Sequence, residues 1–163
     1  MRVLAGGLVL TALLLADSAS VNTVADKVVV NKSKRELLLF KRGIAARTYR
    51  VALGRNPAGA KEREGDGKTP EGLYTIVGRN AKSSFHRSLR ISYPSNLDRE
   101  RARRAGVGTG GDIMIHGLPN GQGRIGAAHR AMDWTEGCIA VTNEEIEEIW
   151  RLVPDGTPVQ INP

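Results

Sequence analysis

The feature that most constrains the fold is a series of short apolar runs separated by turn residues. Val, Leu, Ile, Tyr and Thr dominate these runs, which is typical of β-strands. They predict strands at residues 27–30, 36–41, 47–53, 73–78, 89–93, 112–116 and 157–161. We therefore expect a mostly β domain.

One segment near the C-terminus has the pattern of an amphipathic helix. Thr142 and Glu145 stand in capping-box positions, and Pro154 ends the pattern. The apolar residues recur at helical spacing and form one face: Ile146, Ile149, Trp150 and Val153. We expect Trp150 to belong to the core of the protein and not to a functional site.

A second, shorter helix is predicted in the middle of the chain. Ser95 and Asp98 resemble a capping box that opens a charged helix to about Ala105. Its arginines either form a solvated face or bind substrate or the cell wall: Arg99, Arg101, Arg103 and Arg104. No βαβ alternation is present, so the sequence indicates a β-rich α+β fold with short helices.

The first twenty residues differ from the rest of the chain. Arg2 precedes an uncharged apolar run at residues 3–15, which is followed by small residues. A membrane-spanning helix needs about 20 apolar residues, so the run predicts no stable membrane span. It matches a secretory signal peptide over residues 1–20, with an uncleaved anchor as the alternative. The folded domain is expected at residues 24–163 of an exported protein.

The charge balance limits the classes of partner. The formal net charge of +7 favours a polyanionic environment such as nucleic acid, a membrane surface or an anionic cell wall. Aromatic residues are only 4% of the chain, and no nucleic-acid recognition motif is present. Together with the predicted export, this argues against a nucleic-acid binder.

Cys138 is the only cysteine in the chain. It cannot form an internal disulfide, so in an oxidising compartment it is either buried and inert or retained for its reactivity. Gly137 removes side-chain bulk beside the sulfur. A substrate carbonyl can then approach, and main-chain N–H groups can point at an oxyanion.

A nucleophilic cysteine needs a base, and the chain has three histidines. His116 ends an apolar strand and is followed by Gly117, so we expect it to face an open pocket. His129 lies in the predicted loop between His116 and Cys138, and His86 fits a surface role. One cysteine and three scattered histidines make a poor zinc site, so we expect no metal and no cofactor.

Three segments together resemble the L,D-transpeptidase catalytic domain, the YkuD family. The first is the strand that ends in His116-Gly117, and the second is "TEGCIA" around Cys138. The third is "GDGKTPEGLY" at residues 65–74, similar to the family's Thr-Pro-x-Gly segment. The likeness runs from about residue 24 to residue 161. The segment "DWTEGCIAVTNEEIEEIW" is most similar to the branch of the family that contains the YafK-type enzymes of Gram-negative envelopes.

The resemblance implies a β-sandwich with short helices and a two-step acyl transfer. It assigns Cys138 as the nucleophile and His116 as the base, and it matches Thr135 and Gly137 to motif residues. The thiolate would attack the carbonyl at stem position 3 of peptidoglycan and expel the terminal D-alanine. The main-chain N–H groups of Gly137 and Cys138 would hold the oxyanion.

The implied partners are peptidoglycan stem peptides, with an envelope lipoprotein as a further acceptor or substrate. The implied place is the periplasm or cell envelope of a Gram-negative cell, with a role in cell-wall biogenesis and cell shape. An alternative within the family is hydrolysis by an amidase or L,D-carboxypeptidase, including release of wall-linked lipoprotein. A rival of another class is a catalytically silent module that binds the wall.

The chain departs from the family's usual motif at several points. Glu136 replaces the usual histidine and Ala140 the usual Asn or Arg, and the spacing between base and nucleophile is longer. These departures affect which substrate is used and whether the reaction is transfer or hydrolysis. We hypothesise a supporting role for Glu136, in which its carboxylate orients His116 or His129.

Two further residues precede the motif, Asp133 and Trp134. They either supply polar and stacking contacts of the site or are structural, and the sequence leaves both readings open.

Overall fold

The computed structural model describes residues 24–163, so the predicted signal peptide at residues 1–20 lies outside the described residues. No helix among the residues described is both long and apolar enough to cross a membrane.

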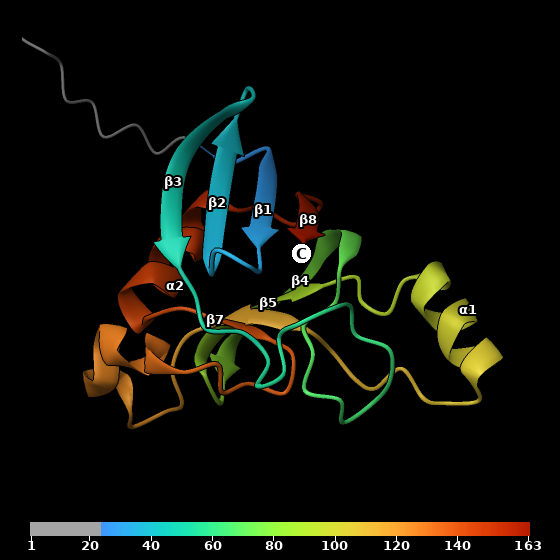
Figure 1. The fold of residues 1–163 in the computed structure, drawn as a ribbon. Coiled ribbons are helices and arrows are strands. Elements are labelled where there is room, and N and C mark those ends of the chain that lie inside the picture. Colours follow the sequence, from blue (N-terminus) through green and yellow to red (C-terminus); the bar gives the residue numbers. More distant parts are fainter. Residues whose placement is uncertain (1–23) are drawn as a thin grey trace, which may run out of the picture.

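The strands of residues 24–163 form one continuous series (Figure 1). Its order is β3-β2-β1-β8-β4-β5-β6-β7, and the neighbours pair antiparallel except β1 with β8 and β6 with β7. The bounds are β1 Lys27–Asn31, β2 Glu36–Lys41, β3 Ile44–Arg50, β4 Gly72–Ser83, β5 His86–Ile91, β6 Met114–His116, β7 Ile139–Ala140 and β8 Pro158–Asn162.

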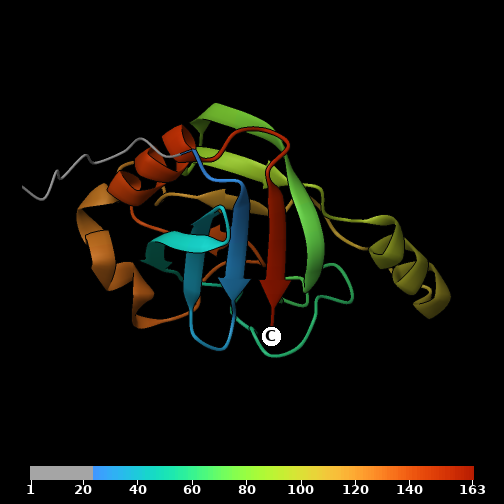
Figure 2. The same cartoon turned by 90° about the horizontal axis from the view of Figure 1, so that it is seen from above.

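Strand β4 joins the two halves of this series. Its start pairs with β8, and from Ile76 onward it pairs with β5. The halves β3-β2-β1-β8 and β5-β6-β7 therefore run in different directions (Figures 1 and 2). Buried side chains of both halves share one core, among them Val28, Leu37, Leu89, Ile115 and Ile161. This confirms the expected β-rich sandwich with short helices.

Helix α2, Asn143–Leu152, begins at the predicted capping box. The Thr142 side chain accepts a hydrogen bond from the Glu145 N–H, and the Glu145 carboxylate accepts one from the Thr142 N–H. The helix packs against β5 and β6, with Ile146 and Ile149 fully buried. The local capping signal and the apolar face therefore agree with the tertiary packing.

Trp150 is half-buried at the edge of the core and lies outside the cavity described below. The guanidinium groups of Arg79 and Arg87 each lie 4.9 Å from its ring centroid. The indole is therefore a structural contact, as expected.

Helix α1, Asn96–Ala105, also begins at its predicted capping box, formed by Ser95 and Asp98. It stands at one side of the molecule, away from the other helices (Figure 1). Its arginine side chains at 103 and 104 are three-quarters exposed and both pair with Glu100. Of the two roles considered for the arginines of this helix, the exposure favours a solvated face.

The sequence pattern misplaced several boundaries. Strand β4 continues to Ser83 and β5 starts at His86, because backbone pairing extends the hairpin through polar residues that carry no strand pattern. A 3-10 helix, η1 Gly123–Ala131, occupies part of the predicted loop. It contains His129 and is interrupted at Gly126, whose φ is +50°.

The free edges of the two halves meet beyond β3. Ala52 and Ala140 exchange two backbone hydrogen bonds, of 3.0 and 2.8 Å. The Thr135 N–H donates to Leu53 O at 3.1 Å, and the Arg55 N–H donates to Thr135 O at 2.9 Å. Residues 135–140 are therefore fixed alongside residues 52–55.

Replacing Ile149 by alanine should remove a fully buried side chain from the interface between α2 and the sheet. We expect the free energy of unfolding to fall by about 2–5 kcal/mol. Ile44, whose exposure is 72%, serves as control, and its change to alanine should alter stability by less than about 0.5 kcal/mol. Urea denaturation measures both; equal losses would contradict the assigned core.

Candidate active site

Cys138 lies in a tight turn immediately before β7. The buried Thr135 hydroxyl donates to Cys138 O at 2.7 Å and accepts from the Gly137 N–H at 3.1 Å. Thr135 therefore shapes the backbone that carries the thiol.

Gly137 is required by its backbone and by its neighbours. Its φ is +132°, and a Cβ there would lie 2.6 Å from Lys68 O. The glycine thus lets the turn approach the loop at residues 54–69. Because the Gly137 N–H is already bonded to Thr135, the expectation that it points at an oxyanion is wrong. The Cys138 N–H is left as the candidate donor from this pair.

His116 ends β6 and is only 3% exposed. Its Nδ1 lies 2.7 Å from Gly117 O, and since a carbonyl only accepts, Nδ1 carries the proton. In the neutral ring Nε2 then keeps a free lone pair. The pKa of His116 is lowered to about 4, and burial is the main cause. The Gly117 carbonyl opposes this lowering, and nearby His129 adds to it. His116 is therefore a neutral base at neutral pH.

Gly117 also permits a close contact behind the site. A Cβ there would lie 2.7 Å from Asn143 Oδ1 at the start of α2. The Gly117 N–H donates to Phe85 O at 3.1 Å. Since β6 ends against this helix, a side chain at position 117 would collide with Asn143, and glycine is required there.

Aromatic rings surround His116. The Phe85 centroid lies 4.5 Å from the imidazole centroid, and the Trp134 centroid lies 5.8 Å from it. The Trp134 Nε1–H donates to His129 Nδ1 at 3.3 Å. The Trp134 ring stacks on Phe85, with 6.2 Å between the centroids, so of the two readings of Trp134 the stacking contact is the one observed. His129 holds the indole, and burial together with Arg130 lowers the pKa of His129.

A cavity of about 450 Å³ brings the predicted nucleophile and base together. Its lining residues are Asn80, Ser83, Ser84, Phe85, Met114, His116, Trp134, Thr135, Glu136 and Cys138. His129 and Asp133 do not line it. His129 lines a second cavity of about 270 Å³, and Trp134 belongs to the lining of both cavities.

Asp133 has a structural set of contacts. Its carboxylate accepts from Arg35 Nε at 3.0 Å and Nη2 at 2.8 Å, and from the Leu53 N–H at 2.9 Å. Of the two readings of Asp133, these bonds favour the structural one, since they fix the segment before the motif.

Glu136 pairs with Arg55, and its side chain is 66% exposed. This corrects the expectation that a histidine would be its partner. The residue lines the cavity, and its exposed carboxylate pairs with Arg55 and not with a histidine.

The Cys138 thiol is partly exposed, and burial raises its pKa; the Met114 N–H and Lys61 oppose that rise and Asp112 adds to it. At neutral pH the site therefore holds a protonated thiol and a neutral imidazole. Such a pair suits proton transfer during attack better than a preformed thiolate–imidazolium pair.

Among residues 24–163 there is no cluster of three or more His, Cys, Asp or Glu side chains that could hold a metal ion.

Sequence reasoning missed Phe85 and Lys61 as neighbours of the site. Phe85 stands in a polar stretch without strand pattern, and Lys61 stands in a loop that reads as solvated. The only sequence feature that could have indicated an ordered loop there was the mixture of charged residues and glycines.

The low pKa of His116 predicts a specific dependence of stability on pH. Because the folded-state pKa of about 4 lies below the unfolded value of 6.5, the unfolded chain binds the proton first as pH falls. The free energy of unfolding should therefore decrease between pH 6.5 and 4.

In His116→Gln the loss of stability between neutral pH and about pH 4.5 should be smaller than in the wild type by about 2 kcal/mol. Urea denaturation at both pH values measures it, with His86→Gln, a partly exposed histidine, as control. The same pH dependence in wild type and His116→Gln would refute the assignment.

The chain is similar to several known proteins. The family model of the YkuD L,D-transpeptidase catalytic domain matches residues 25–161. YafK of Escherichia coli K12 is 29% identical over 109 residues, which cover 65% of this chain and 36% of YafK. YkuD of Bacillus licheniformis is 27% identical over 144 residues, covering 87% of this chain and 68% of that protein. Both are named provisionally as L,D-transpeptidases.

Solved structures share the fold. The helical cell shape determining protein Pgp2 of Campylobacter jejuni has a TM-score of 0.64 and 26% identity, over 84% of this chain and 47% of Pgp2. An L,D-transpeptidase of Mycobacterium tuberculosis has a TM-score of 0.55 and 17% identity, over 85% of this chain and 58% of that one. This chain spans about a third of YafK and half of Pgp2. The chain belongs to the YkuD family of L,D-transpeptidase catalytic domains.

Proposed function

We propose that the protein is a cysteine-dependent L,D-transpeptidase that acts on peptidoglycan stem peptides through an acyl-enzyme, in the periplasm or cell envelope. The observation that carries the proposal is the shared cavity of Cys138 and His116 in a chain of this family. The free Nε2 of His116 provides the lone pair that the reaction needs.

In the first step His116 Nε2 takes the proton from Cys138 Sγ. The sulfur attacks the carbonyl carbon of the diamino acid at stem position 3, and the Cys138 N–H donates to the oxyanion. The C–N bond then breaks, and the imidazolium returns its proton to the departing amine of D-alanine. The low pKa of His116 makes this imidazolium a strong acid, which favours release of the amine.

In the second step an amine attacks the thioester and gives a proton to His116, and the thiol is regenerated. The amine belongs to a neighbouring stem peptide, an envelope lipoprotein or a free amino acid. If water attacks instead, the product is a carboxylic acid, and the enzyme is a carboxypeptidase or an amidase that releases wall-linked lipoprotein.

The likeness to Pgp2, a protein named for helical cell shape, supports a role in wall biogenesis and cell shape. The cavity of about 450 Å³ is large enough for a peptide end, since ligand pockets generally measure about 300–1,000 Å³.

Cys138→Ala should abolish turnover of tetrapeptide muropeptides, and His116→Ala should reduce it by at least about 100-fold, since the base is lost. Mass spectrometry of the products measures both effects. Cross-linked dimers indicate transfer, tripeptides indicate hydrolysis, and loss of attached lipoprotein indicates release. Wild-type turnover by Cys138→Ala would refute the proposal.

Glu136→Gln should reduce the same turnover far less than His116→Ala, because Glu136 lies at the exposed rim and pairs with Arg55. We expect less than about a tenfold loss, the scale of one weak surface interaction. Equal losses in the two variants would mean that His116 is not the primary base.

A further inference from the structure

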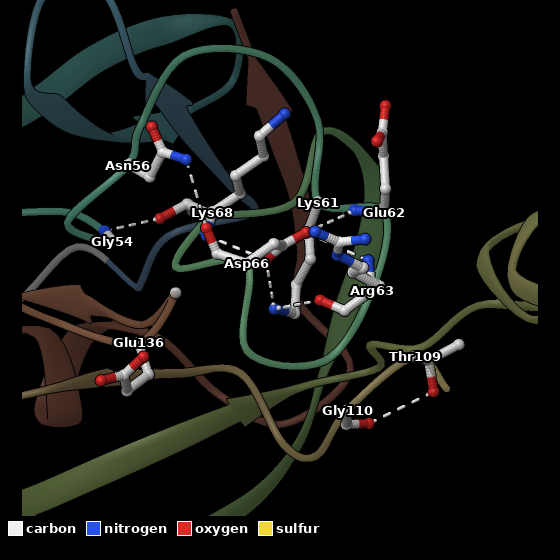
Figure 3. Close-up of polar contacts among 12 residues, drawn as sticks. Gly54, Asn56, Lys61, Glu62, Arg63, Asp66, Lys68, Thr109, Gly110 and Glu136 are labelled. Carbon is white, nitrogen blue, oxygen red and sulfur yellow. Dashed lines mark hydrogen bonds and ion pairs between the residues drawn. The ribbon is translucent and has the colours of Figure 1, made fainter. Parts of the chain in front are cut away.

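A buried ion pair organises the loop that faces the turn of Cys138. Lys61 Nζ donates to Asp66 Oδ1 at 2.8 Å and to Arg63 O at 3.1 Å. The Asp66 carboxylate also accepts from the N–H groups of Glu62, Arg63 and Lys68 at 2.8–3.0 Å. Figure 3 shows this network, with Glu136 on the neighbouring segment.

The two charged side chains are almost fully enclosed, with exposures of 4% for Lys61 and 8% for Asp66. Burial raises the pKa of Asp66, but the hydrogen bonds from Lys61 and from three backbone N–H groups lower it to about 2. Asp66 is therefore ionised and holds the ammonium in one position. Burying two charged groups costs desolvation free energy unless both are fully hydrogen-bonded. The position of this ion pair therefore needs an explanation.

Lys61 and the proposed nucleophile line the same cavity. A cavity of about 290 Å³ is lined by Lys61, Glu64, Gly65, Gly110, Gly111, Asp112, Ile113, Glu136 and Cys138. Cys138 thus lines two cavities, one shared with His116 and the other shared with Lys61.

Lys61 is the one cationic side chain among the residues that line these two cavities. The other ionisable groups that line them are His116, Glu64, Asp112, Glu136 and the thiol itself. Asp112 pairs with Arg90 and Glu136 with Arg55, so both carboxylates are partly balanced from outside. His116 is neutral before the reaction, so it provides no resting positive charge.

We propose that Lys61, held by Asp66, is a positioning residue that stabilises the thiolate of Cys138 as it forms. This inference rests on the proposed nucleophilic role of Cys138. A nearby cation favours a thiolate over a thiol, and it acts strongly where water is excluded. The direction of the Lys61 effect on the pKa of Cys138 agrees, since Lys61 lowers it.

A second buried lysine, Lys32 in the turn after β1, bonds to the same loop and offers a matched control. Lys32 Nζ donates to Gly59 O, to Thr69 O and to Glu71 Oε1, the last at 2.8 Å. Lys32 is 2% exposed and fastens the same loop, but it lines neither cavity with Cys138. A purely structural role of Lys61 would make the two lysines equivalent.

The test is the pH profile of Cys138 alkylation by iodoacetamide, followed by intact mass, in which the thiolate displaces iodide. Lys61→Met/Asp66→Asn removes both charges together, so neither charge is left buried without its partner. We expect its alkylation midpoint to rise by about one pH unit. Lys32→Met/Glu71→Gln should keep the wild-type midpoint. A midpoint unchanged in the first variant, or shifted equally in both, would overturn the proposal.

A second measurement uses the wild-type fold and does not depend on those variants. The ¹⁵N signal of Lys61 Nζ should shift as Cys138 ionises, and the shift should vanish in Cys138→Ala. A Lys61 Nζ chemical shift that stays constant as Cys138 ionises would also overturn the inference. Both readouts follow thiol ionisation, so they stay distinct from muropeptide turnover, which tests the proposed function.

Discussion

The backbone contact between residues 52–55 and 135–140 is the constraint on which the site depends. It joins the free edges of the two halves of the sheet through Ala52 and Ala140, and it fixes Thr135 against Leu53. The carboxylate of Asp133 reinforces it, because it accepts from Arg35 and from the Leu53 N–H. The turn that carries Cys138 is thereby held next to β6, and β6 delivers His116. Residues far apart in the sequence form one cavity because these two edges meet.

The same enclosure sets the chemistry. Burial beside Phe85 and Trp134 keeps His116 neutral, and burial raises the pKa of the Cys138 thiol. A neutral thiol and a neutral base avoid the desolvation cost of a resting ion pair, and in the proposed mechanism charge develops only during attack. The burial of His116 also makes its imidazolium a stronger acid, which in the proposed mechanism protonates the departing amine. In the proposed mechanism Lys61, held in place by Asp66, supplies the positive charge that the neutral histidine lacks.

Local signals predicted much of the fold. Both capping boxes, the apolar face of α2 and the β-rich runs depend on neighbours in sequence, so they could be read from the chain alone. The strand end at His116 and the glycine beside Cys138 likewise indicated the two residues that the proposed function makes base and nucleophile. The contacts of Phe85, Lys61 and Glu136 depend on segments that meet only in the folded protein. The partner of Glu136 is Arg55, some eighty residues earlier, and no periodicity in the sequence marks that pairing.

The central claim is that the sulfur of Cys138 carries the acyl group. Intact-mass analysis of the wild-type protein, quenched soon after mixing with a disaccharide tetrapeptide, tests this most directly. The account predicts a mass gain of one disaccharide-tripeptide acyl group, located by proteolysis on the peptide that contains Cys138. The same acyl group located on any other side chain would contradict it.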